Sequence, residues 1–509
     1  MIRPIHWILL WVSLTAGTVS VPAFSLLGPF KDGTTVAGEA WQGEPFGGRP
    51  QGLGYTLAGD IGGPMFAHEA YRWSVPTITY AFDSSFLRFF GTNGVAAVEE
   101  AIAILNALPP VSKMSPTLDE FPLDTKRENS AAAAMGLLDL KSLTLSYLLE
   151  ELGLTIPERF VFGLRARQAG QFVTNYSVIQ MNYDPVTIAP SRYVNGVLYN
   201  YVIFDDLGPQ GAEWASAVEW YQLDPLRLPY SSVVGGSGNP DLVLGSTPDL
   251  SGGSLALQGL LLGQYFTGLT RDDVGGLRFL LSPNNIVFET LLPTVVPAGA
   301  LGGNSPWGPI GIGVTNVAIT NILGTNVISN FTVTGLRPGL NKLTFQRVNY
   351  DSILGTTFTP ITNRYTDTFI NTTNGRYIKQ KVARAILQPD IVFALNDLDT
   401  TLAVPNGAFR TPTTGWSNNA AINTVITGLQ NLAGPGTITP NIVIAFTDLV
   451  PFFLNVPGGL DSDAPIPLTW GSFDGSDRPP VVYPVFQHPL MPQLSLEYLQ
   501  SLATRRKNN

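Results

Sequence analysis

Residues 71 to 82 read YRWSVPTITYAF, and residues 93 to 108, the next apolar segment, read NGVAAVEEAIAILNAL. In the first segment large apolar residues alternate with small or polar ones, which is typical of a β-strand. In the second segment the apolar residues recur at helical spacing and form one stripe, which consists of Val95, Val98, Ile102 and Leu105. Asn93 can cap the start of this helix, and Pro109 ends it. The sequence therefore predicts a strand followed by an amphipathic helix.

Helix and strand patterns alternate from this unit as far as residue 292. Further helices are predicted at residues 137–154, with Gly153 as the C-terminal cap, and at residues 211–221, 256–263 and 271–281. Strands are predicted at residues 159–167 and 171–181. Asn195 and Gly196 form the preferred two-residue turn of a hairpin. Residues 60–292 are therefore expected to form an α+β domain.

Helix patterning nearly disappears beyond residue 293. Residues 293–309 are rich in Gly and Pro and read as a linker. Strands are predicted at residues 315–333, 341–351, 365–371, 376–387 and 391–395, with a turn at Asn374-Gly375 and one inserted helix at residues 420–432. Residues 310–490 are therefore expected to be a mainly β sandwich region of one or two modules. We expect its core to be separate from that of residues 60–292.

The N-terminus predicts export. Residues 1–25 carry Arg3, an apolar run and a small-residue exit at Val21-Pro22-Ala23 or Ala23-Phe24-Ser25, which is the layout of a signal peptide. A single N-terminal membrane anchor is the alternative, and no later segment reads as a membrane span. The chain has no Cys, so an exported protein would depend on core burial for its stability. We expect a secreted or cell-surface protein with a solvated C-terminal tail at residues 491–509.

Charge excludes one class of partner. The chain has 29 Lys plus Arg against 38 Asp plus Glu, which gives a net charge of -9. A mildly acidic chain lacks the basic footprint that nucleic acid requires. A protein or a surface polymer is therefore the expected kind of partner.

Two stretches resemble the metzincin zinc proteases, and the matrixins in particular. The strand and helix at residues 71–108 are similar to the opening of those enzymes, and LTRDDVGGL at residues 269–277 is similar to the segment that leads into a later helix. The resemblance implies a motif HExxHxxGxxH between these pieces, but the motif is missing. The only His residues are His6, His68 and His488. A catalytic zinc needs three protein ligands, so we expect a degenerate, non-catalytic relative that binds no catalytic zinc.

The second of these stretches lies within residues 257–281, which are predicted to pack in the hydrophobic core and not to supply catalytic or metal-binding residues. Residues 257–281 place leucines along one side of two expected helices. Thr270 would cap the second helix, and Asp272 and Asp273 would complement its dipole by roughly 0.3 to 1 kcal/mol each. We expect Leu277→Ala to destabilise the fold by about 2 to 5 kcal/mol and Asp272→Asn to be a small perturbation.

Other chemistries find little support in the sequence. Gly252-Gly253-Ser254-Leu255-Ala256 approximates a nucleophile elbow but lacks its final Gly. Glu213 and Glu219 lie beside two Trp residues, but six residues along a helix place them on different sides.

Calcium is the ligand that the sequence favours most. Alternate acids that could bind it in extended loops are Asp397, Asp399, Asp461 and Asp463. Turn capping is the commoner use of such residues. No catalytic residue and no cofactor site is predicted.

Three hypotheses remain open. The first is an exported, non-catalytic scaffold or binding protein with a metzincin-like domain. The second is a structural subunit of an extracellular layer or filament. The third is a carbohydrate-active enzyme that works through two carboxylates.

Overall fold

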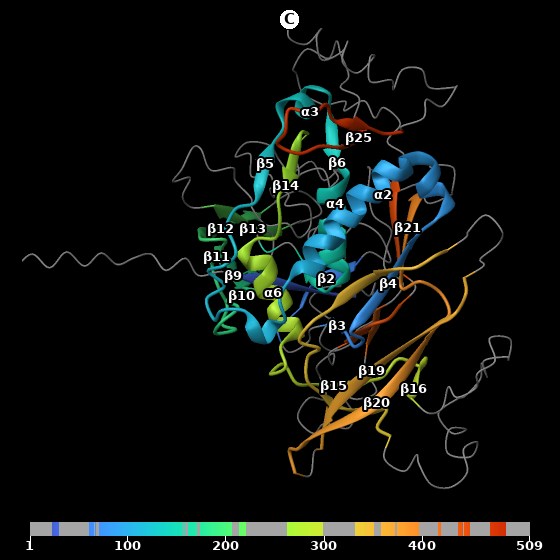
Figure 1. Cartoon of the computed structure of the whole chain (residues 1–509). Helices are drawn as coiled ribbons and strands as arrows, with labels where there is room; N and C mark the ends of the chain where they lie inside the picture. The colour runs from blue at the N-terminus through green and yellow to red at the C-terminus, as the bar shows by residue number, and fades with distance from the viewer. Residues whose placement is uncertain are drawn as a thin grey trace, which may run out of the picture.

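The computed structural model (Figure 1) describes the protein in segments. These are residues 23–29, 61–65, 67, 71–155, 157, 161–169, 174–205, 213–219, 262–298, 331–350, 358–371, 374–396, 416–418, 436–440, 442–447 and 469–484. Within them the chain forms a mixed α/β structure with several sheets, and its C-terminal part consists mostly of strands.

A parallel sheet lies at the centre of the fold, and its order is β18-β4-β21-β24. Its strands are β18 (Thr344–Arg347), β4 (Thr77–Phe82), β21 (Ile391–Asn396) and β24 (Ile442–Thr447). β4 runs parallel to β18 on one side and to β21 on the other. Parallel strands are usually covered on both faces, and β4 is buried from Ile78 to Phe82, as this arrangement requires.

This sheet corrects the predicted division into separate cores. β4 comes from the first predicted domain, and its three companions come from the second. One hydrophobic core includes Phe82 and Phe86 together with Phe393, Phe446 and Trp470. The separate-core prediction is therefore wrong. Hydrophobic periodicity shows which face of a strand is buried, but it does not show which strand lies beside it.

Helix α2 (Ser84–Ala107) follows β4 and packs against the sheet and against α4 (Leu140–Glu151). Asp83 caps α2 by accepting hydrogen bonds from the backbone N–H groups of Ser85 and Phe86. The helix therefore begins before the predicted Asn93, and it kinks at Gly91, where φ is 59°. The amphipathic helix is otherwise confirmed, whereas the single strand predicted at residues 71–82 is divided into β3 (Arg72–Trp73) and β4, which belong to different sheets.

A second, antiparallel sheet has five strands in the order β15-β17-β19-β20-β16, and Figure 1 shows its hairpin below the parallel sheet. The strands are β15 (Val287–Thr290), β17 (Thr334–Arg337), β19 (Ile361–Ile370), β20 (Tyr377–Ile386) and β16 (Val295–Pro297). β16 lies inside the predicted linker, so that stretch begins with a strand that pairs with β20. Three buried ion pairs lie on or beside this sheet: Arg72 with Glu289, Arg337 with Asp367, and Arg384 with Asp390.

Short sheets surround these two layers. One contains β1 (Phe24–Pro29), β2 (Ile61–Met65), β7 (Leu154–Thr155) and β10 (Asn182–Tyr183). Others pair β5 (Lys126–Glu128) with β14 (Gln264–Phe266), and β8 (Gly163–Ala169) with β9 (Thr174–Ile179). A further sheet joins β11 (Tyr193–Val194), β12 (Val197–Asp205) and β13 (Glu213–Glu219). Two more contain β22 (Trp416–Asn418), β23 (Gly436–Ile438) and β3 (Arg72–Trp73), and β26 (Val481–Val482), β25 (Thr469–Ser472) and β6 (Leu137–Asp139).

The predicted helix at residues 211–221 is wrong, because residues 213–219 form β13, which pairs with β12 along its whole length. This strand pairing overrides the local helical pattern. The predicted helix at residues 256–263 lies almost entirely outside the described residues, and residues 264–266 after it form β14.

The predicted signal peptide overlaps the fold at its end. Ala23, Phe24 and Ser25 are all buried, and the last two belong to β1. A signal peptide that ended at Ser25 would therefore remove the first two residues of β1. None of the helices in the described segments combines the length and apolar character that a membrane span requires.

Candidate functional site

Helix α6 (Arg271–Leu281) is the element that the sequence singled out, and it forms as predicted. Thr270 is its N-cap, and its side chain accepts a hydrogen bond from the backbone N–H of Asp273. The Asp273 carboxylate accepts in return from the backbone N–H of Thr270 at 2.8 Å, which completes a capping box. Both acids of the first turn therefore lie where they complement the helix dipole.

Asp272 is a buried acceptor, with only 1% of its surface exposed. Its Oδ1 accepts from the backbone N–H of Ala23 at 2.8 Å, and its Oδ2 accepts from that of Asn195 at 2.6 Å. The Asn195 side chain makes two further hydrogen bonds. Its Oδ1 accepts from the backbone N–H of Asp272, and its Nδ2 donates to Thr270 Oγ1 at 3.1 Å. Asp272 thus joins the start of β1, the β11–β12 turn and α6. The expectation that Asp272 is only a dipole partner was incomplete.

The β11–β12 turn is built as the sequence predicts. Asn195 and Gly196 both have positive φ, at 45° and 80°, which is the conformation of the two-residue hairpin turn. The turn places the backbone N–H of Asn195 against Asp272.

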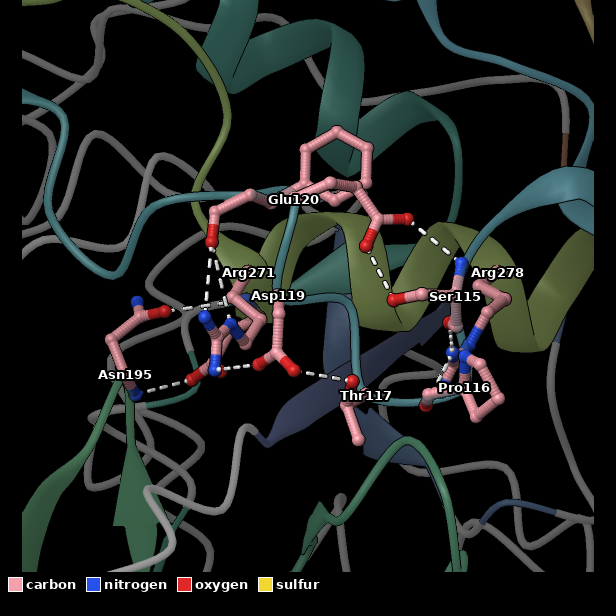
Figure 2. Close-up of polar contacts among 10 residues, drawn as sticks. Ser115, Pro116, Thr117, Asp119, Glu120, Asn195, Arg271 and Arg278 are labelled. Atoms are coloured by element: carbon pink, nitrogen blue, oxygen red, sulfur yellow. Dashed lines mark hydrogen bonds and ion pairs between the residues drawn. The ribbon is translucent and has the colours of Figure 1, made fainter.

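The outward side of α6 holds the loop at residues 115–121, as Figure 2 shows. Arg271 forms an ion pair with Asp119 at 3.1 Å, and its Nε and Nη2 donate to the carbonyl oxygen of Phe121, each at 3.3 Å. Asp119 is 70% exposed, so this pair contributes little to stability.

Arg278 binds the other end of the same loop (Figure 2). Its Nη1 donates to the carbonyl oxygens of Ser115 at 2.7 Å and Pro116 at 2.8 Å, and its Nη2 donates to that of Pro185 at 2.8 Å. Burial lowers the pKa of the Arg278 guanidinium from its ordinary value. These contacts hold the loop at residues 115–121 against α6.

The inward side of α6 is apolar. Leu277, Leu280 and Leu281 are all buried. A Cβ on Gly276 would lie 2.6 Å from Leu154 Cδ2, so a larger residue at this position would require the Leu154 side chain of β7 to move. A small depression adjoins Leu277 and Leu281, and its lining is mainly Leu, Val, Met and Phe. The predicted packing role is confirmed for the leucines of α6, whereas Leu257, Leu260 and Leu261 lie outside the described residues.

Asp139 is one of the buried acids that the sequence analysis does not identify. Asp139 caps α4, accepts hydrogen bonds from the backbone N–H of Ser142 at 3.0 Å and from its hydroxyl, and is fully buried. Burial raises the pKa of this carboxyl to about 6. The Asp-Leu-Lys-Ser spacing ahead of an apolar run is a capping signal, and it could have identified this residue.

Most of the predicted ligand residues lie outside the described residues. This applies to His68 and His488, to Ser254, and to the calcium candidates Asp397, Asp399, Asp461 and Asp463. Glu213 and Glu219 begin and end β13, so their backbones are about 20 Å apart at 3.3 Å per residue. The pair is therefore too widely spaced for a two-carboxylate glycosidase, although the predicted helix was wrong. No group of three or more His, Asp or Glu side chains in the described segments is placed to hold a metal ion.

Known proteins offer no further guide. No model of a protein family matches the chain, and no curated protein or solved structure is significantly similar to it.

Proposed function

We propose that the protein is an exported, non-catalytic binding protein in which the segments that resemble metzincins serve as a scaffold. The observation that carries this proposal is the use of α6. Its acids are hydrogen-bonded to backbone N–H groups, and its leucines fill the core. The zinc proteases that this segment resembles carry their HExxHxxGxxH motif ahead of it, and that motif is missing from the chain.

The residue inventory supports the same conclusion. The whole chain has three His and no Cys, and His6 lies in the predicted signal peptide. Two His at opposite ends of the chain do not supply the three ligands and the open position of a catalytic zinc. Export rests on the N-terminal layout of residues 1–25.

The test combines an activity assay with metal analysis. The purified full chain is incubated with unfolded casein and a mixed peptide library, with and without added zinc, beside an active metalloprotease as the positive control. Zinc bound after dialysis is measured by mass spectrometry. We expect no cleavage and much less than one zinc per chain. Stoichiometric zinc together with cleavage that a chelator abolishes would overturn the proposal.

A further inference from the structure

The outer face of the β19–β20 hairpin is positively charged, whereas the chain as a whole has a net charge of -9. Alternate residues of β19 share this face, and they are Thr362, Arg364, Thr366 and Thr368. The antiparallel register places Lys381 opposite Thr366 and Lys379 opposite Thr368, with Tyr377 one position beyond on the same face. No residue of either strand on this face is acidic.

The cations on this face are exposed and are not used within the fold. Arg364, Lys379 and Lys381 are all exposed, and none forms an ion pair in the part of the chain that the structure describes. Lys379 and Lys381 are two residues apart on one strand, about 7 Å, and Arg364 is the diagonal neighbour of Lys381. Like charges at such positions repel each other, so the arrangement does not stabilise the hairpin.

The chemistry of the face defines its partner. Three cations in a chain of net charge -9 attract an anionic partner to one place. The threonines add hydroxyl groups that both donate and accept hydrogen bonds, and Tyr377, which is 56% exposed, adds an aromatic ring at the end. The hairpin strands show no apolar centre among their exposed residues on this face, whereas the core of a protein interface is normally apolar.

We propose that the outer face of the β19–β20 hairpin binds a linear acidic polysaccharide. Arg364, Lys379 and Lys381 pair with its carboxylate or sulfate groups, and the threonine hydroxyls hydrogen-bond to sugar hydroxyls. This inference rests on the exported location within the proposed function, because such polymers lie outside cells. It does not depend on the absence of protease activity.

The experiment compares two variants that lose the same charge in different places. Arg364→Gln/Lys379→Gln/Lys381→Gln removes the cations of the hairpin face. Arg88→Gln/Lys113→Gln/Arg478→Gln removes three exposed cations from elsewhere in the described structure and serves as the matched control. Isothermal titration calorimetry of the full chain uses polygalacturonate as the probe, with neutral dextran and single-stranded DNA as comparisons, and circular dichroism verifies each fold.

We expect the wild type and the control variant to bind polygalacturonate with the same affinity and to show no binding to dextran. The hairpin variant should bind about tenfold more weakly, the scale expected for three exposed ion pairs, and its affinity should depend less on salt. Thr366→Val should weaken binding without changing the salt dependence, because it removes a hydroxyl and no charge.

Three results would overturn the inference. They are an absence of polygalacturonate binding by the wild type, equal losses in the two triple variants, and DNA binding as tight as polygalacturonate binding. None of these results would touch the non-catalytic proposal, which depends on the zinc and casein measurements. Conversely, protease activity would leave this binding test intact.

Discussion

The two faces of the β19–β20 hairpin place charged residues in opposite circumstances. On the inner face, Arg384 is buried against Asp390, and Asp367 is buried between Arg337 and Gln380. On the outer face, Arg364, Lys379 and Lys381 are exposed and carry no ion pair among the described residues. Buried charges must be paired to persist, whereas exposed ones have little effect on stability and are free to serve binding. The hairpin therefore separates a structural use of charge from a functional one.

The largest change in the free energy of unfolding is expected from a substitution on the inner face of the hairpin. Asp390 accepts hydrogen bonds from the backbone N–H of Thr79 at 2.8 Å and from the Thr79 hydroxyl at 2.9 Å, and it also pairs with Arg384. Asp390→Asn leaves the buried guanidinium without its counter-charge and should lower the free energy of unfolding by about 3 to 5 kcal/mol. Urea denaturation measures the loss. The double variant Arg384→Met/Asp390→Asn should recover part of it, and a double variant as unstable as the single one would contradict the account.

A buried acid with a raised pKa should give a pH-dependent effect of intermediate size. The folded state holds Asp139 with a pKa of about 6 against the ordinary aspartate value of 3.8, so between these values the folded state binds more protons than the unfolded state. The contribution of Asp139 to stability therefore falls as pH rises from about 4 to 6, by up to roughly 3 kcal/mol. Asp139→Asn keeps a capping side chain and removes the titration.

The measurement is the difference in unfolding free energy between wild type and Asp139→Asn at pH 4, 5, 6 and 7. We expect the difference to shift in favour of the variant across this range and to level off above pH 6. A difference independent of pH would show that burial does not raise this pKa.

The next effect concerns Asp272. An Asn side chain has one oxygen, so Asp272→Asn can accept from only one of the two backbone N–H groups that Asp272 serves, and the other is left buried without a partner. This should cost about 1 to 3 kcal/mol, more than the small perturbation that the sequence alone suggests. Thermal and urea unfolding of a chain that retains Ala23 measure the change. Asp119→Asn, which alters the exposed pair with Arg271, is the matched control and should change stability by less than about 1 kcal/mol.

The smallest effect is expected on the outer face. Lys379→Gln and Lys381→Gln should each change the free energy of unfolding by no more than about 0.5 kcal/mol, because both side chains are exposed and repel each other. A loss of more than about 2 kcal/mol in either variant would show that the face is covered within the protein and would erase the contrast between the two faces.

The sequence predicts this molecule well where structure is local. The Thr270 cap of α6, the Asn195-Gly196 turn and the hairpin turn at Asn374-Gly375, where Gly375 has a φ of +67°, depend on neighbouring residues, and all were predicted correctly. The sequence also shows the two-residue alternation of β19 and β20. The outer face of the hairpin could therefore have been predicted from the spacing of Thr, Arg and Lys along the two strands.

The partners of β4 and β13 could not be predicted in the same way. Residues 213–219 have a helical pattern, but seven consecutive pairs with β12 decide their conformation. β4 reads as a strand in any context, and nothing in its own residues indicates β18 or β21 as neighbours. The role of Asp272 was missed for a related reason, because its two donors come from segments far away in the sequence.

The position of β4 also constrains the order in which the protein can assemble. Thr79 and Asp390 are hydrogen-bonded across 311 positions of the chain, and β4 has no neighbour in its sheet that precedes residue 344. Contacts of such long range slow folding, because a large loop must close before they form. The central sheet therefore completes only after most of the chain has been synthesised. A chain that is exported before it folds meets this condition, because both ends of the sheet are then present together.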